Sequence, residues 1–194
     1  MNTPAHMIFA AAAFARPHDR MRTFAALAGA LAPDVSLYLM AGTSVWILGL
    51  SPHYVFGTLY FSDAWQQVFK VDNSFIVWGA MFALAWAMGV KNGMVFAASG
   101  LMHLAFDFPL HHDDGRAHFW PVSDWVFHSP ISYWDQSHYG GVIGPIEMGV
   151  SLLFCVLLIR RYPSLRSRLL ICGLAAVQLA PVFIWAFVFS GDPG

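Results

Sequence analysis

The sequence predicts an all-α integral membrane protein, and three observations support this fold class. Hydrophobic residues make up 58% of the chain and charged residues 11%, and the mean hydropathy is +0.57, whereas soluble domains carry about 25% charged residues. Apolar segments of the length that an α-helix needs to cross the hydrocarbon layer, about 20 residues, recur along the chain. The basic residues fall on one side of these segments. We therefore expect a single transmembrane helical domain over residues 1–194.

We expect a bundle of about five spanning helices, accompanied by shorter ones. The apolar run of residues 5–14 is half as long as a span and predicts a short, partly embedded N-terminal helix. Residues 43–69 are rich in aromatic residues and are interrupted by glycine and proline, which is typical of interfacial helices. The five expected spans are residues 23–42, 72–90, 93–110, 141–159 and 169–189.

The positions of the basic residues predict the orientation. Lys and Arg accumulate in short cytoplasmic loops of membrane proteins, and eight of the ten Lys and Arg residues lie on one side of the expected spans. These eight are Arg16, Arg20, Arg22, Lys91, Arg160, Arg161, Arg166 and Arg168. Placing them in the cytoplasm puts residues 43–71 and 111–140 on the periplasmic side of a bacterial inner membrane.

The charge pattern also limits the partners. The formal net charge is −1, and no cluster of basic residues combines with aromatic residues as a nucleic-acid-binding face requires. Cys155 and Cys172 lie in apolar runs, where cysteine is usually a small packing group. We therefore expect no nucleic acid, and instead membrane lipids, a small-molecule or lipid substrate and a membrane protein as partners.

Acidic and histidine residues are expected to gather in the outer half of the bilayer. His103 and Asp107 are four residues apart, so they project from one face of their helix. Asp34 follows Pro33, which disturbs the helical hydrogen bonds, and Asp72 begins the next expected span. His6 joins the group if the first helix runs inward from the outer surface. The polar loop His111-His112-Asp113-Asp114 continues from the His103 face.

Such a cluster needs a physical cause, because an ionisable side chain at the bilayer centre costs about 2.5 to 3.5 kcal/mol. A divalent metal ion held by carboxylates and imidazoles would offset this cost, with zinc or manganese favoured by the mixed ligand set. The expected ligands are His6, Asp34, Asp72, His103, Asp107, His111 and His112. Asp34, Asp72 and Asp107 are the expected catalytic carboxylates, because an unligated carboxylate can act as the base for a metal-activated water.

Each of these residues also has a structural interpretation. His103 and Asp107 could form a hydrogen-bonded pair that fixes helix packing. The His111 to Asp114 run could be a solvated loop. For Glu147 the structural interpretation is preferred, because a lone Glu near a helix end can reach the interface or a backbone group. The remaining loop residues, among them His118 and His128, lie between Trp and Tyr residues and are expected to be interfacial.

The order of these motifs resembles the bacterial inner-membrane, metal-dependent hydrolases of the YdjM type. The resemblance rests on Thr3 and His6 before a small apolar helix, residues 29–34 ending in Pro-Asp, His103-x-x-x-Asp107, and Trp120-Pro121. It implies a metal-dependent hydrolase. This chain departs from the family pattern at Ser36, where a second acid is common, and at residues 72–74, where the family has Thr-His-Ser. These departures leave fewer strong metal ligands.

The sequence leaves three functions open. The first is a membrane-embedded hydrolase with a periplasm-facing His/Asp metal site, acting on a lipid or another amphipathic ester. The second is a non-enzymatic membrane subunit or scaffold whose polar cluster is structural. The third, a small transporter, is ranked last because the polar residues do not continue into the cytoplasmic half.

Overall fold

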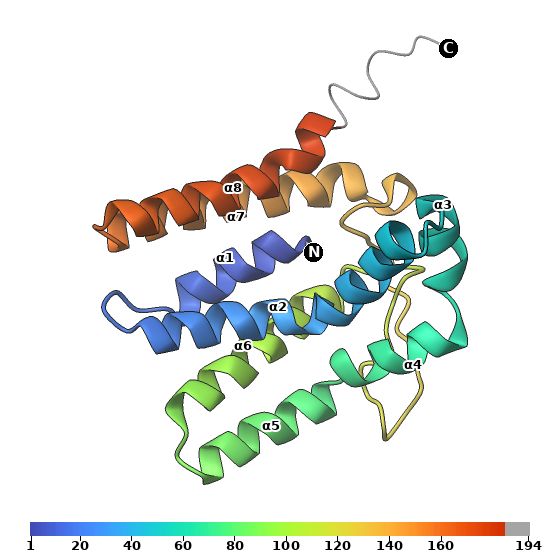
Figure 1. The fold of residues 1–194 in the computed structure, drawn as a ribbon, viewed down its shortest axis with the longest axis horizontal. Coiled ribbons are helices and arrows are strands. Elements are labelled where there is room, and N and C mark those ends of the chain that lie inside the picture. The colour runs from blue at the N-terminus through green and yellow to red at the C-terminus, as the bar shows by residue number, and fades with distance from the viewer. Residues whose placement is uncertain (185–194) are drawn as a thin grey trace.

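The structure is a computed structural model that describes residues 1–184, and it shows a bundle of helices (Figure 1). The all-α class is therefore confirmed for this part of the chain. Several of the helices lie side by side along the longest axis of the molecule. The main helices are α1 (Thr3–Phe14), α2 (Arg20–Gly42), α4 (Asp63–Asp72), α5 (Phe75–Ala87), α6 (Lys91–Asp107), α7 (Gly140–Arg161) and α8 (Leu165–Ile184).

The prediction of five spanning helices is wrong. Among residues 1–184, three helical stretches are long and apolar enough to cross a membrane: Arg20–Ile47, Asp63–Ala87 and Gly140–Arg161. In place of the expected span 93–110 the structure has helix α6, which ends at Asp107. This helix has 17 residues, and His103 and Asp107 are among them. The expected span 169–189 runs beyond the residues that the structure describes. Its described part belongs to α8, which begins four residues before that span.

Helix α1 lies inside the bundle despite its short length. Its buried residues include Ala5, Ile8 and Ala10, which are fully inaccessible to solvent. It contacts α2, α6, α7 and α8, and its apolar side chains belong to the largest buried cluster. The small side chains of Ala5, Ala10 and Ala11 let neighbouring helices approach α1 closely. The first helix therefore brings its polar residues into the interior of the bundle.

Two glycines allow close helix contacts around α6. A methyl group on Gly29 of α2 would lie 2.1 Å from the Phe96 carbonyl oxygen on α6. One on Gly100 of α6 would lie 2.2 Å from the Trp78 ring on α5. Neither position has room for a side chain, so glycine brings α2 and α5 against α6. This packing fixes the position of α6, which carries His103 and Asp107.

The aromatic segment between α2 and α4 forms short, irregular helical turns. They are two π-helical turns (Thr43–Ile47 and Val55–Leu59) and α3 (Pro52–Tyr54). Large side chains of this segment are exposed, among them Trp46, Ile47 and Phe56, as expected for residues at a membrane interface. The expected span 72–90 was misplaced at its start, since α4 ends at Asp72 and α5 begins at Phe75.

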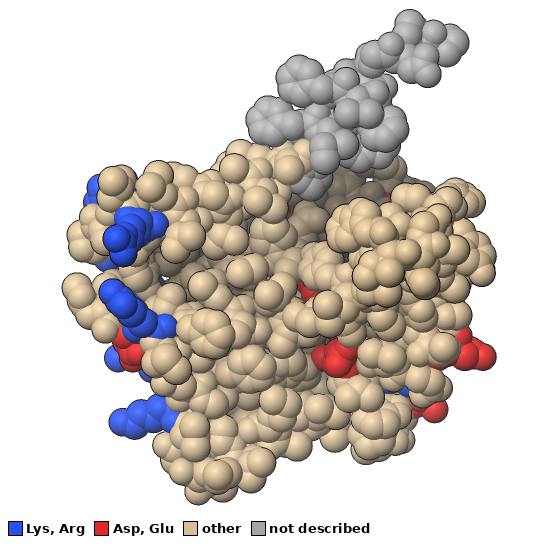
Figure 2. Space-filling model, viewed as in Figure 1, with Lys and Arg blue, Asp and Glu red and all other residues tan. Residues whose placement is uncertain are grey.

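The basic residues gather at one end of the molecule. Figure 2 shows Lys and Arg side chains at the left end, where Figure 1 places the start of α2 and the turns between α5 and α6 and between α7 and α8. Acidic side chains are visible mainly in the middle and at the opposite end. That opposite end carries the aromatic segment around α3 and the long loop between α6 and α7. The two ends of the bundle therefore differ in charge.

Candidate metal centre

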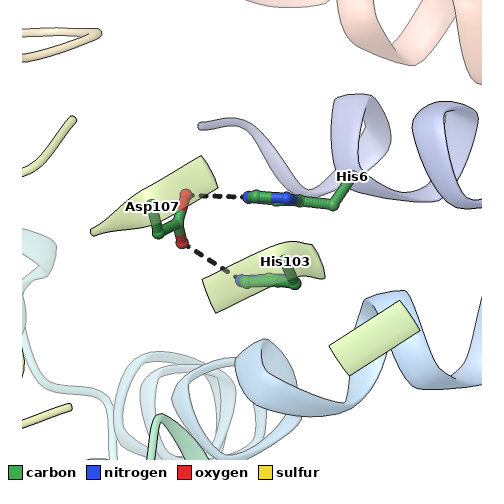
Figure 3. A group of neighbouring side chains, drawn as sticks. All are labelled: His6, His103 and Asp107. Carbon is green, nitrogen blue, oxygen red and sulfur yellow. Dashed lines mark hydrogen bonds and ion pairs between the residues drawn. The ribbon is translucent and has the colours of Figure 1, made fainter. Parts of the chain in front are cut away.

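Three buried side chains from two helices form a compact group of metal-binding type. His6 on α1 and His103 and Asp107 on α6 each offer one ligand atom, and these atoms all lie within 4.8 Å of one another. His6 Nε2 is 2.8 Å from Asp107 Oδ1, and His103 Nε2 is 3.1 Å from Asp107 Oδ2. Each imidazole thus points at a different oxygen of the same carboxylate (Figure 3).

Helix geometry explains this arrangement. His103 and Asp107 are separated by one helical turn and lie on the face of α6 that packs against α1 and α2. The ring of His6 stacks on that of His103, with centroids 3.6 Å apart and planes 9° apart. Stacking holds both rings parallel, so that their Nε2 atoms approach the carboxylate together.

The surroundings of His103 fix its tautomer. Its Nδ1 lies 2.7 Å from the Ala30 carbonyl oxygen on α2, and because a carbonyl only accepts, Nδ1 must carry the proton. Nε2 is then the ring nitrogen that faces the Asp107 and Asp34 carboxylates, and in a neutral ring it carries the lone pair. A backbone carbonyl that orients one ring nitrogen while the other stays available is typical of metal-binding histidines. Nδ1 of His6 is also buried, but finds no such acceptor within residues 1–184.

Asp34 lies next to this group. Its Oδ1 is 3.6 Å from His103 Nε2, so the side chains of Asp34, His103 and Asp107 converge as the sequence predicted. Its other oxygen accepts a short hydrogen bond from the Thr3 hydroxyl, which also contacts the Tyr38 hydroxyl at 2.6 Å. Asp34 is therefore held beside the three-residue group by the start of α1.

A cation already faces Asp107. The Met1 ammonium lies 2.5 Å from Asp107 Oδ1, and both groups are buried. This contact offsets part of the cost of burying the carboxylate. A metal ion at Asp107 would compete with it.

The loop after α6 adds His111 and Asp114 to the site. His111 Nε2 is 3.6 Å from Asp107 Oδ2, and its Nδ1 is 2.8 Å from Asp114 Oδ2. Burial by itself would lower the pKa of His111, but the two carboxylates outweigh it and raise that pKa. Burial would raise the pKa of Asp114, but the hydrogen bond and charge of His111 lower it instead. These groups form an ion pair at the edge of the site.

Two expected ligands do not join the group. Asp72 is the last residue of α4, and one of its carboxylate oxygens is buried without a hydrogen-bond partner in the described part of the chain. His112 turns away: its Nδ1 lies 2.5 Å from the Ser129 carbonyl oxygen, and its ring stacks on His138 at 3.6 Å. Asp72 lies outside the three-residue group because its helix, α4, packs mainly on α2, and His112 lies outside it because its ring is held by Ser129 and His138.

Glu147 anchors the start of the chain to the bundle. Its Oε1 accepts hydrogen bonds from the Asn2 backbone (3.0 Å), the Asn2 side chain (3.1 Å) and the Gln178 side chain (2.9 Å). This bonding agrees with the structural interpretation of Glu147. Asn2 and Gln178 were missed in the sequence, because a single amide residue carries no spacing signal.

A cavity of about 380 Å³ opens beside the group. Asp34, Asp107 and His111 contribute polar surface to it, and Leu37 and Phe56 contribute apolar surface. Neither Asp72 nor His112 lines this cavity. A small molecule in the cavity would therefore contact Asp107 and the neighbouring carboxylate of Asp34.

Comparison with family models, with curated proteins and with solved structures found no match for this chain.

Proposed function

We propose that this chain is a membrane-embedded, metal-dependent hydrolase whose divalent metal, zinc or manganese, is held by His6, His103 and Asp107. The observation that carries the proposal is the convergence of two imidazole nitrogens and a carboxylate on one buried point. Three protein ligands and one open position are the usual arrangement of a catalytic zinc site. The contact of His103 Nδ1 with the Ala30 carbonyl oxygen fits the role of His103 as a metal ligand.

The neighbouring groups fit hydrolysis. A bound divalent metal would lower the pKa of a water molecule to about 7. Asp34 lines the cavity 3.6 Å from His103 and is not one of the three closest ligand groups, so it is placed to accept a proton from that water. His111, paired with Asp114, lies on the cavity side of Asp107 and can donate a proton to a leaving group.

We further propose that the site faces the periplasm of a bacterial inner membrane. The proposal is supported by the basic end of the bundle, which the positive-inside rule assigns to the cytoplasm. The cavity lies toward the other end, beside the exposed aromatic segment. An amphipathic ester could then reach the cavity from the outer leaflet.

We also keep kinship with the YdjM-type hydrolases as a proposal. It is supported by the meeting of His6, Asp34, His103 and Asp107, which are the residues that carry the sequence resemblance. The missing acid at Ser36 and the missing histidine near residues 72–74 leave the three-residue group as the core of the site.

Elemental analysis of protein purified in mild detergent tests the metal. The unaltered chain should hold about one zinc or manganese ion per molecule, and Asp107→Asn should lower its metal affinity by at least about tenfold, because one anionic ligand is lost. Hydrolysis of a chromogenic amphipathic ester should fall in parallel. Asp113→Asn is the matched control, since this nearby carboxylate is exposed. Metal-free wild-type protein that cannot be loaded with either ion would refute the proposal.

A structural role is the second candidate, favoured by the number of polar groups that already have partners. Asp107 contacts Met1 and His6, Asp34 contacts Thr3, and Glu147 contacts Asn2. Such a network could fix the first helix in the bundle of a non-enzymatic subunit. In that case Asp107→Asn would lower the unfolding temperature, and no metal would be found in the wild type.

A further inference from the structure

Arg116 is a partly buried cation on the wall of the cavity. It lies in the loop after α6 and lines the same cavity as Asp107 and His111. Its guanidinium carbon is 4.5 Å from the centre of the Tyr60 ring and 4.1 Å from that of Phe69. Tyr60 and Phe69 are themselves buried. Two aromatic contacts hold the planar guanidinium in one orientation.

The hydrogen-bonding capacity of this guanidinium is incompletely used. Its Nη1 atom is buried and has no hydrogen-bond partner in the described residues. No carboxylate of residues 1–184 forms an ion pair with it, because the nearby Asp114 is engaged by His111 and Trp134. A buried N–H without an acceptor costs free energy. Arg116 also lines the cavity, so its charge is available to an acceptor group of a bound molecule there.

The cavity is polar in one part and apolar in another. Arg116, His111 and Asp107 form polar surface, whereas Leu37, Phe56 and Phe61 form apolar surface. Phe56 and Phe61 are about half exposed, with relative accessibilities of 51% and 52%. They belong to the aromatic segment that has the character of a membrane interface. A ligand that fits both parts has an anionic head and an apolar chain.

Charge limits which head can bind. Asp34, Asp107 and Asp114 would repel an anion, so positive charge must be supplied beside them. A divalent metal at His6, His103 and Asp107 and the Arg116 guanidinium would supply it together. A phosphate group can accept two hydrogen bonds from the planar guanidinium in a bidentate pair, and its other oxygens can bind a metal ion. Metal and arginine pairs of this kind stabilise phosphoryl groups.

We propose that the cavity binds the phosphate ester headgroup of a lipid, with Arg116 on the phosphate oxygens and the apolar chain along Phe56 and Phe61. The inference rests on the proposed function, since it makes phosphate esters the substrate class of that site. It assigns Arg116 a role in substrate recognition.

Binding of dodecylphosphonate to the metal-loaded, purified full chain tests the inference, because the carbon–phosphorus bond of this probe is not hydrolysed. Isothermal titration calorimetry should show saturable binding that Arg116→Gln weakens at least tenfold, the loss expected for a charge-assisted hydrogen bond. Lys70→Gln is the matched control. It removes a cation from the same end of the bundle, but Lys70 pairs with Asp124 and does not line the cavity, so binding should change less than twofold.

Two further ligands separate the head from the chain. Inorganic phosphate lacks the chain and dodecanol lacks the anion, so each should bind the unaltered protein at least tenfold more weakly than dodecylphosphonate. This comparison tests whether binding needs both the anionic head and the apolar chain, even if Arg116→Gln does not fold. Dodecanol binding as tightly as the phosphonate would refute the anionic head. If inorganic phosphate binds as tightly as dodecylphosphonate, the ligand is a free anion. That result would refute the proposal that the cavity binds a lipid.

The same experiment distinguishes this inference from the proposed function. Stoichiometric metal together with phosphonate binding that Arg116→Gln leaves unchanged would refute the inference alone. Protein that holds no metal but binds the phosphonate through Arg116 would refute the hydrolase and leave the phosphate site standing.

Discussion

His103 and His118 show how surroundings give two buried histidines different roles. Both direct Nδ1 at a backbone carbonyl oxygen 2.7 Å away, on Ala30 and Asn73 respectively. The Nε2 of His103 faces Asp34 and Asp107, whereas the ring of His118 packs against Phe75 and Phe108. His103 is therefore available to a cation, and His118 holds the loop on the start of α5.

The neutral state of His118 should make stability depend on pH. Burial lowers its pKa from 6.5 to about 4, so the unfolded chain takes up a proton first as the pH falls. The contribution of neutral His118 to the free energy of unfolding is therefore fully present above about pH 6.5. It is lost as the pH falls toward about 4. Between pH 7 and pH 5 the wild type should lose about 2 kcal/mol from this group.

His118→Asn should remove this part of the pH dependence, since asparagine keeps a donor for the Asn73 carbonyl but does not titrate. Thermal unfolding in detergent at several pH values is the measurement. His53→Asn, at an exposed position on α3, should retain the wild-type dependence. A His118→Asn curve parallel to the wild type would contradict the assignment.

At the scale of residues, helix spacing predicted more of the site than loop sequence did. His103 and Asp107 were placed together because one helical turn separates them, and Asp34 was expected nearby because it lies at the same depth. The directions of His111 and His112 depend on loop backbone angles that no periodic pattern reports. The sequence gives no sign that Arg116 belongs to the site, because its aromatic neighbours Tyr60 and Phe69 come from a distant segment.

At the scale of elements, the contact of α2 with α6 determines where the site residues lie. Gly29 touches the backbone of α6 at Phe96, and the next residue, Ala30, provides the carbonyl oxygen for His103. Helix packing and the orientation of a candidate ligand thus depend on the same turn of α2.

Gly29→Ala should therefore affect both stability and metal content. The added methyl group would lie 2.1 Å from the Phe96 oxygen, and forcing such helices apart costs about 1 to 3 kcal/mol. The separation also lengthens the Ala30 contact with His103. Thermal unfolding and elemental analysis measure the two effects.

Gly149→Ala is the control, because a methyl group at this position of α7 has no atom of residues 1–184 within 4 Å. It should leave both quantities near their wild-type values or raise stability slightly. If Gly29→Ala unfolds at the wild-type temperature, close packing of α2 on α6 does not hold this part of the bundle.

The break between α4 and α5 was predictable in part. Ser74 caps α5, since its hydroxyl accepts hydrogen bonds from the Ile76 and Val77 backbone, and a serine before an apolar run is a helix-start signal. The expected span nevertheless began at Asp72, because it was chosen from the length of the apolar segment and not from this helix-start signal. The half-length first helix was expected, but its depth within the bundle depends on contacts with four other helices.

At the scale of the whole molecule, the separation of charge gives the bundle a direction. The turn between α7 and α8 lies at the basic end, and the loop between α6 and α7 lies at the other. In the proposed orientation the basic end faces the cytoplasm, in line with the positive-inside rule. The number of spans was overestimated because hydropathy alone does not show where a helix ends.

Cysteine labelling in spheroplasts tests this orientation. In a background of Cys155→Ala and Cys172→Ala, a membrane-impermeant maleimide should label Val122→Cys, whose native side chain is 78% exposed in the long loop. It should not label Ser164→Cys, in the turn between α7 and α8, until the cells are lysed. The reverse pattern would invert the orientation and place the cavity on the cytoplasmic side.

The long separation of His6 from Asp107 along the chain has a consequence for biogenesis. The two residues are 101 positions apart, so the first helix is synthesised well before its partners on α6. During that interval its imidazole has neither the carboxylate nor the stacked ring beside it. Folding of α6 must therefore precede final docking of the N-terminal segment, and acquisition of the proposed metal would be a late step that reports complete assembly.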